Sequence, residues 1–154
     1  MRTTPTVIIA SLAVLLIVVG CSRARNQTEV IVEKDEPLKF VLSGTGIVDY
    51  FEVSGPDRRH QCPKDRLGYM ERYWQIAPLT DTDVAALEKM APITYGKLPT
   101  GFRQVVPEHG ELPPILETEP GCPYFVTLAI RNGSGVNKMF GLHDGKIVAE
   151  GQEP

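Results

Sequence analysis

Apolar and polar residues alternate in a series of short runs along most of this chain, and Gly and Pro turns separate the runs. A period of two is typical of β-strands with one buried face. The runs are also rich in β-branched and aromatic residues, which favour strands. They predict strands over residues 29–32, 38–42, 47–53, 69–76, 93–96, 102–106, 124–131, 139–142 and 146–148.

Two regions carry the clearest local signals. Residues 124–131 are apolar on both faces, since Tyr124 and Phe125 cannot share one, and this predicts a central or doubly covered strand. Near the end of the chain, Asp144-Gly145 lies between two apolar runs. That dipeptide favours a tight β-hairpin.

Only one stretch has helical spacing. Val84, Leu87 and Ala91 recur at helical intervals, Thr80 can cap the start, and Pro92 ends the run. This predicts a short helix over residues 81–90. The whole pattern therefore predicts an all-β fold, a small β-sandwich with immunoglobulin-like architecture, about eight short strands and one short helix. An α+β fold with the helix on a sheet is the alternative.

The start of the chain changes the picture, because it is not part of this pattern. Arg2 precedes an apolar run from Val7 to Val19, and the run closes on Gly20-Cys21. This arrangement resembles the signal of bacterial lipoproteins, which implies cleavage before Cys21 and lipidation of that residue. The run of thirteen residues is short for an uncleaved spanning helix, which needs roughly twenty.

The resemblance divides the chain into a signal peptide (residues 1–20), a lipidated tether (21–28) and a single β domain (29–154). Ser22, where lipoproteins kept in the inner membrane tend to have Asp, implies the outer membrane facing the periplasm. Removing residues 1–20 takes away Arg2 and no carboxylate, which leaves 15 basic and 19 acidic side chains, a net charge of −4. This acidic balance argues against nucleic acid as a partner.

Cys62 and Cys122 remain after lipidation, and in an exported protein such a pair predicts a disulfide. With Trp74 they mimic the spacing of immunoglobulin domains, but Pro63 and Pro123 follow the cysteines. The predicted disulfide therefore joins two loops. A metal site is not expected, because His60 and Cys62 have no second closely spaced pair of ligands.

No residue pattern predicts catalysis or a cofactor. Ser43 and Ser134 stand beside glycines without the frame of a hydrolase elbow. The histidines at positions 60, 109 and 143 lie in predicted loops or turns. We therefore expect a protein that is not an enzyme, with an envelope hydrolase as the weakest alternative.

Two regions are candidates for binding. The loop from Asp57 to Tyr73 carries a local charge of +2 and aromatic side chains, a composition that recognition surfaces favour. Its predicted partner-binding residues are Arg58, Arg59, Arg66, Tyr69 and Arg72. A cleft for a small molecule or glycan is predicted to be lined by Trp74, Tyr95 and Phe102.

The second region contains the stretch Ile93-Thr94-Tyr95-Gly96-Lys97-Leu98-Pro99-Thr100-Gly101-Phe102-Arg103-Gln104. It is similar to a pattern, I-x-Y-G-x-x-P-x-G-F-x-Q, in small uncharacterised β-domain proteins of the bacterial envelope. The resemblance covers roughly residues 74–131 and implies a compact β domain without an activity. Pro99 and Gly101 predict a tight turn that brings Tyr95 and Phe102 together across neighbouring strands.

These observations favour a lipid-anchored envelope protein with a non-catalytic binding or structural role, its partner being another envelope protein. The alternative is a lipoprotein that binds a small molecule or glycan.

Overall fold

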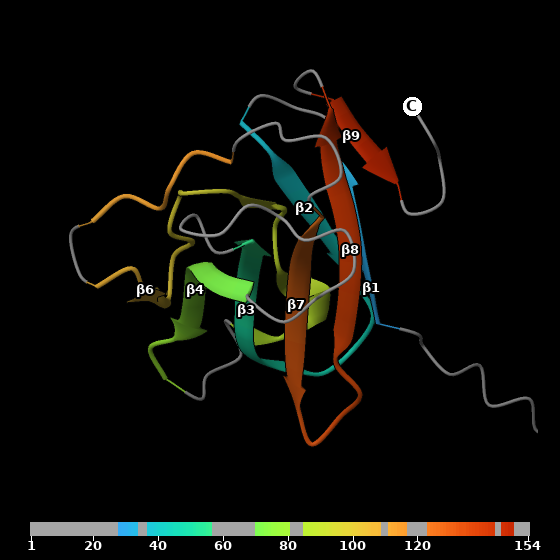
Figure 1. Cartoon of the computed structure of the whole chain (residues 1–154). Helices are drawn as coiled ribbons and strands as arrows, with labels where there is room; N and C mark the ends of the chain where they lie inside the picture. Colours follow the sequence, from blue (N-terminus) through green and yellow to red (C-terminus); the bar gives the residue numbers. More distant parts are fainter. Residues whose placement is uncertain are drawn as a thin grey trace, which may run out of the picture.

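The computed structural model describes residues 28–33, 37–56, 70–80, 85–108, 111–116, 123–143 and 146–149. These residues form two antiparallel sheets that pack as a sandwich (Figure 1). The predicted all-β sandwich is therefore confirmed, with nine strands in the described residues. No α-helix lies on either sheet in the described parts, so the α+β alternative does not hold.

The smaller sheet has the order β1-β2-β5. Its strands are β1 (Glu29–Glu33), β2 (Lys39–Ser43) and β5 (Ile93–Thr94). The larger sheet has the order β6-β4-β3-β7-β8-β9. Its strands are β6 (Phe102–Val106), β4 (Met70–Pro78), β3 (Ile47–Pro56), β7 (Tyr124–Arg131), β8 (Val136–His143) and β9 (Lys146–Ala149).

Aromatic side chains join the two sheets. The ring of Phe40 on β2 meets Phe51 of β3 edge to face at 5.0 Å and Phe140 of β8 at 6.1 Å. Phe51 in turn packs edge to face on Trp74 of β4 at 6.0 Å. Aromatic pairs in this geometry stabilise a core beyond the area that they bury. The centre of the sandwich is therefore an aromatic cluster that spans both layers.

β7 is a central strand, as its sequence predicts, and it pairs with β3 on one side and β8 on the other. Its inner residues are buried, while Phe125, Thr127 and Ala129 on the outer face are half-buried. The predicted hairpin is confirmed as well. His143 of β8 pairs with Lys146 of β9, which leaves only residues 144 and 145 between the two strands.

A β-bulge explains why two adjacent residues of β4 are both buried. The register passes from Val53 opposite Trp74 to Ser54 opposite Arg72, so Tyr73 has no partner on β3. Such a bulge redirects a side chain. Tyr73 packs edge to face on Tyr124 at 5.9 Å, and its hydroxyl donates to the Pro56 carbonyl at 2.6 Å.

The helix predicted over residues 81–90 is wrong for the part that the structure describes, which begins at Ala85. Ala86 is extended, with φ −67° and ψ 121°, and it forms a bridge with Ile47. Only a three-residue 3-10 turn follows, η2 (Leu87–Lys89), and its first amide donates to the Gly46 carbonyl at 2.8 Å. Short isolated helices are marginal, and here bonds to β3 and its preceding turn replace helical ones.

Candidate functional site

The three residues of the predicted ligand cleft do not form an open surface. Trp74 has no exposed surface and Phe102 is buried, while Tyr95 is half-buried. The Trp74 and Tyr95 rings meet edge to face at 5.4 Å. Trp74 and Phe102 belong to the hydrophobic core, so a ligand could stack on Trp74 only if the core opened.

The tight turn predicted at Pro99 is confirmed, but its consequence differs from the prediction. The amide of Phe102 donates to the Pro99 carbonyl at 3.1 Å, and Gly101 has φ +82°, which glycine adopts readily. Tyr95 directly follows β5 of the smaller sheet, whereas Phe102 begins β6 of the larger sheet. The two residues therefore do not lie on neighbouring strands of one sheet, because this turn carries the chain between the layers.

Gln104 on β6 is the polar centre of this region. Its side-chain oxygen accepts a hydrogen bond from the indole nitrogen of Trp74 at 3.2 Å. Its side-chain nitrogen donates to the carbonyl oxygens of Pro107 at 3.0 Å and Glu111 at 2.8 Å. One amide group therefore joins the core to a segment that has no helix or strand.

This segment, residues 111–116 (Glu-Leu-Pro-Pro-Ile-Leu), is called the proline segment below. The Tyr95 hydroxyl holds it at a second point by donating to the Pro114 carbonyl at 2.8 Å. Gly96 lies so close to Pro113 that an added Cβ would come within 3.3 Å of its ring. Leu116 at the end of the segment packs against the core.

These contacts show what the individual residues of the stretch 93–104 do in the fold. Ile93 and Phe102 are core residues, Pro99 and Gly101 make the turn, and Tyr95 and Gln104 hold the proline segment. Sequence reasoning missed Gln104 as a site residue. Its position as the last residue of the stretch 93–104 could have drawn attention to it, but its hydrogen-bond partners lie up to thirty residues away in the sequence.

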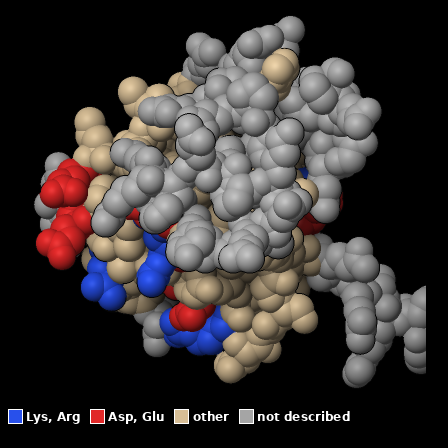
Figure 2. Space-filling model, viewed as in Figure 1, with Lys and Arg blue, Asp and Glu red and all other residues tan. Residues whose placement is uncertain are grey.

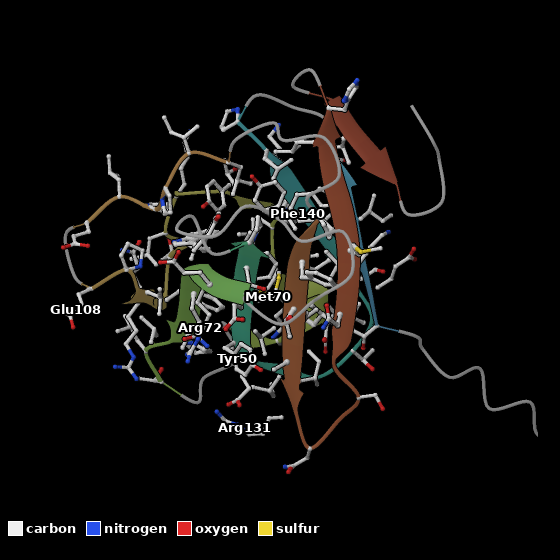
Figure 3. The ribbon with its side chains drawn as sticks, viewed as in Figure 1. Tyr50, Met70, Arg72, Glu108, Arg131 and Phe140 are labelled. Atoms are coloured by element: carbon white, nitrogen blue, oxygen red, sulfur yellow. The ribbon has the colours of Figure 1, made fainter. Side chains whose placement is uncertain are left out.

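The outer face of the larger sheet carries a second group of polar side chains. The register places Glu52 of β3 between Gln75 of β4 and Thr127 of β7. Arg72 lies opposite Ser54, the next residue of β3 on that face, and is exposed. Figure 3 shows Arg72 together with Tyr50 and Arg131 in the lower part of the view.

The electrostatics of this face are set by a half-buried carboxyl group, that of Glu52, close to the positive charge of Arg72. Burial raises the pKa of Glu52, and the positive charge of Arg72 only partly offsets this effect. Arg131 pairs with Asp49 at 3.4 Å, and both side chains are exposed. Lys and Arg atoms gather in the same lower part of the molecular surface (Figure 2). We call Tyr50, Glu52, Arg72 and Arg131 the outer-face group.

Of the residues predicted to bind a partner, only Arg72 falls within the described residues. Arg58, Arg59, Arg66 and Tyr69 lie outside them. Tyr73, expected to add aromatic surface to that loop, is instead buried. Cys21, Cys62 and Cys122 also lie outside the described residues, as do His60 and His109.

The remaining candidates for chemistry are dispersed. Ser43 ends β2, Ser134 is exposed before β8, and His143 is half-buried at the end of β8. Within the described ranges, no three His, Cys, Asp or Glu residues come together in a group that could hold a metal ion.

No protein-family model, curated protein or solved structure matches this chain. Among the residues that the structure describes, no helix has the length and apolar character needed to cross a membrane.

Proposed function

We propose that this protein is a non-catalytic binding protein of the cell envelope, anchored by lipid on Cys21, that holds another envelope protein on the outer face of its larger sheet. The outer-face group is the observation that carries the proposal. Tyr50 and Arg72 flank Glu52 on β3 and β4, two adjacent strands that both lie in the interior of the sheet. Residues fixed on paired strands lose little conformational freedom on binding.

The chemistry of the group suits a protein partner. Tyr and Arg are enriched where interfaces carry most of their binding energy. Arg72 offers a planar set of donors that fits carboxylates on a partner, and it is exposed while Glu52 beside it is half-buried. Arg58, Arg59 and Arg66, which the sequence also predicts to bind a partner, precede β4 in the sequence and lie outside the described residues.

A photo-cross-linking amino acid at position 50, in the full chain in its native host, tests this surface. We expect one discrete adduct with another envelope protein, and we expect Arg72→Glu to abolish it. Arg103→Glu is the matched control, because Arg103 is exposed on β6 opposite Ala77, roughly 17 Å along β4 from Arg72. An adduct that survives Arg72→Glu, or no adduct at all, would reject the proposal.

The anchor has its own test. In the same host, Cys21→Ser should move the protein out of the membrane fraction, because a lipidated cysteine anchors a chain that a serine cannot. Unchanged fractionation would reject the lipid anchor, and it would leave the result at position 50 intact.

A further inference from the structure

The two most exposed large hydrophobic side chains of the described residues lie three positions apart in the proline segment. Leu112 is 85% exposed and Ile115 is 87% exposed. Single exposed apolar residues are ordinary on protein surfaces. Here, however, the exposure coincides with a backbone that the rest of the molecule holds in place.

Three contacts hold the backbone of the proline segment in the position that leaves Leu112 and Ile115 exposed. The Glu111 and Pro114 carbonyls accept hydrogen bonds from Gln104 and Tyr95, at 2.8 Å each, and Pro113 packs closely on Gly96. Pro113 and Pro114 are half-buried, so the side of the segment that faces the body is already used. Leu112 and Ile115 are left on the solvent side (Figure 1, orange trace at the upper left).

The two consecutive prolines also restrict the backbone conformation of the proline segment. Proline fixes its own φ, and it restricts the preceding residue to extended conformations. Consecutive prolines therefore favour a polyproline II backbone, which has three residues per turn. In that geometry Leu112 and Ile115 share one edge, which agrees with their nearly equal exposure.

The charges beside this edge indicate the kind of partner. Glu108 and Glu111 are exposed, and Figure 3 shows Glu108 at the outer margin of the molecule. Residues 107–116 contain no Lys or Arg. Carboxylates in this position favour a basic partner and oppose approach to a bilayer of anionic lipids.

We infer that the proline segment is a docking element for a partner protein, which receives Leu112 and Ile115 in a groove lined by aromatic side chains with basic groups at its rim. Aromatic grooves bind extended proline-containing segments, and here Leu112 and Ile115 would enter the groove in place of the half-buried prolines. A segment that is already ordered also loses little entropy on binding. This site is separate from the outer-face group and does not depend on the function proposed for that group.

Photo-cross-linking from positions 112 and 115 of the full chain, in its native host, locates the partner. Position 31 is the control, because Ile31 is an exposed apolar residue on β1, far from the proline segment in Figure 1. We expect an adduct with one protein from positions 112 and 115 and none from position 31. Adducts with phospholipid, adducts only with a second copy of this chain, or no adducts would overturn the inference.

The affinity of the purified captured protein for variants of this chain tests whether Leu112 and Ile115 make the contact. Leu112→Ser with Ile115→Thr should weaken the Kd at least about tenfold, because each side chain loses an apolar contact of roughly 1 kcal/mol or more. Leu79→Ser with Ile31→Thr makes the same changes at other exposed positions and should leave the Kd unchanged. Equal effects of the two double variants would overturn the inference.

Two further measurements sharpen the result. Glu108→Lys with Glu111→Lys should weaken binding at low salt, and the difference should shrink at high salt, because screening removes the attraction to a basic rim. Arg72→Glu should bind fully. Loss of binding in Arg72→Glu would assign the captured protein to the outer-face group and overturn the docking role of the proline segment.

Discussion

Different contacts join the two sheets along two sides of the sandwich. Where β1 of the smaller sheet approaches β8 of the larger one, the ammonium group of Lys138 donates to the Val30 carbonyl at 3.0 Å. Where β5 approaches β4 and β6, the Trp74 and Tyr95 rings meet, and Gln104 joins Trp74 to the proline segment. We call these the lysine closure and the aromatic closure.

The two closures differ in the surface that each leaves exposed. Lys138 lies on the same face of β8 as Phe140, so a charge points inward beside β1, the edge strand of the smaller sheet, a device that discourages pairing with other chains. The aromatic closure uses a buried ring and several hydrogen bonds, and it presents Leu112 and Ile115 to solvent. The lysine closure therefore covers a strand edge, whereas the aromatic closure leaves two large apolar side chains exposed.

The largest effect should come from Trp74→Ala, because it breaks the aromatic closure from within the core. Removing a fully buried aromatic side chain costs about 3–5 kcal/mol. Urea unfolding followed by circular dichroism measures the loss, with the exposed Leu79→Ala as control. A loss below about 1 kcal/mol would mean that Trp74 is not a core residue.

Gln104→Glu should have an intermediate effect and act on the proline segment. The carboxylate can still accept from Trp74, but it cannot donate to the Pro107 and Glu111 carbonyls. We expect a loss of about 1–3 kcal/mol in the free energy of unfolding. Amide hydrogen exchange should also become faster in residues 107–116 while β7 stays protected, and uniform exchange would contradict a local role.

Lys138→Met tests the lysine closure and should cost about 1 kcal/mol, because methionine keeps the apolar stem and loses the bond to Val30. The exposed Lys97→Met is the matched control. Sedimentation velocity should also reveal more self-association in Lys138→Met, since an unguarded strand edge can pair with another chain. If the two variants behave alike, Lys138 does not seal this side.

The smallest effect concerns Glu52, which lies on the outer face of the larger sheet and takes part in neither closure. Its pKa is raised in the folded protein, chiefly by burial, so the folded state binds the proton more tightly than the unfolded state does. Stability should therefore fall as pH rises from the ordinary pKa of a glutamate through the raised value.

Glu52→Gln should remove that fall, as measured by urea unfolding between pH 4 and pH 8. Glu88→Gln, a change at an exposed carboxyl on η2, should retain it. A stability profile of Glu52→Gln that still falls over this range would trace the effect to another group.

Strands were predictable because each has a local signature. The bounds of β6 and β7 agree with the alternating runs at 102–106 and 124–131, and the Asp-Gly turn predicted the β8–β9 hairpin. The helical spacing around Leu87 failed because Ala85, Ala86 and Leu87 are all buried, whereas a surface helix buries one face. Contacts with β3 and the turn before it decide this segment, and they are distant in sequence.

The candidate site was less predictable for the same reason. Trp74, Tyr95 and Phe102 are apolar enough for either a cleft or a core, and only the packing of two sheets distinguishes the two. Gln104 acts through bonds to distant backbone groups, which no local pattern records. The bulge that buries Tyr73 changes the face of one residue, a shift that alternation alone cannot reveal.

β1 is the first strand after the proposed tether, so any mechanical force between membrane and domain enters the fold at Glu29. If Cys21 is lipidated, the residues before Thr28 allow the domain at most about 25 Å of reach. A pull along β1 would have to shear every pair from Glu29 with Ser43 to Glu33 with Lys39 at once. β1, which receives the hydrogen bond from Lys138, would thus also carry the tension between the lipid anchor and the domain.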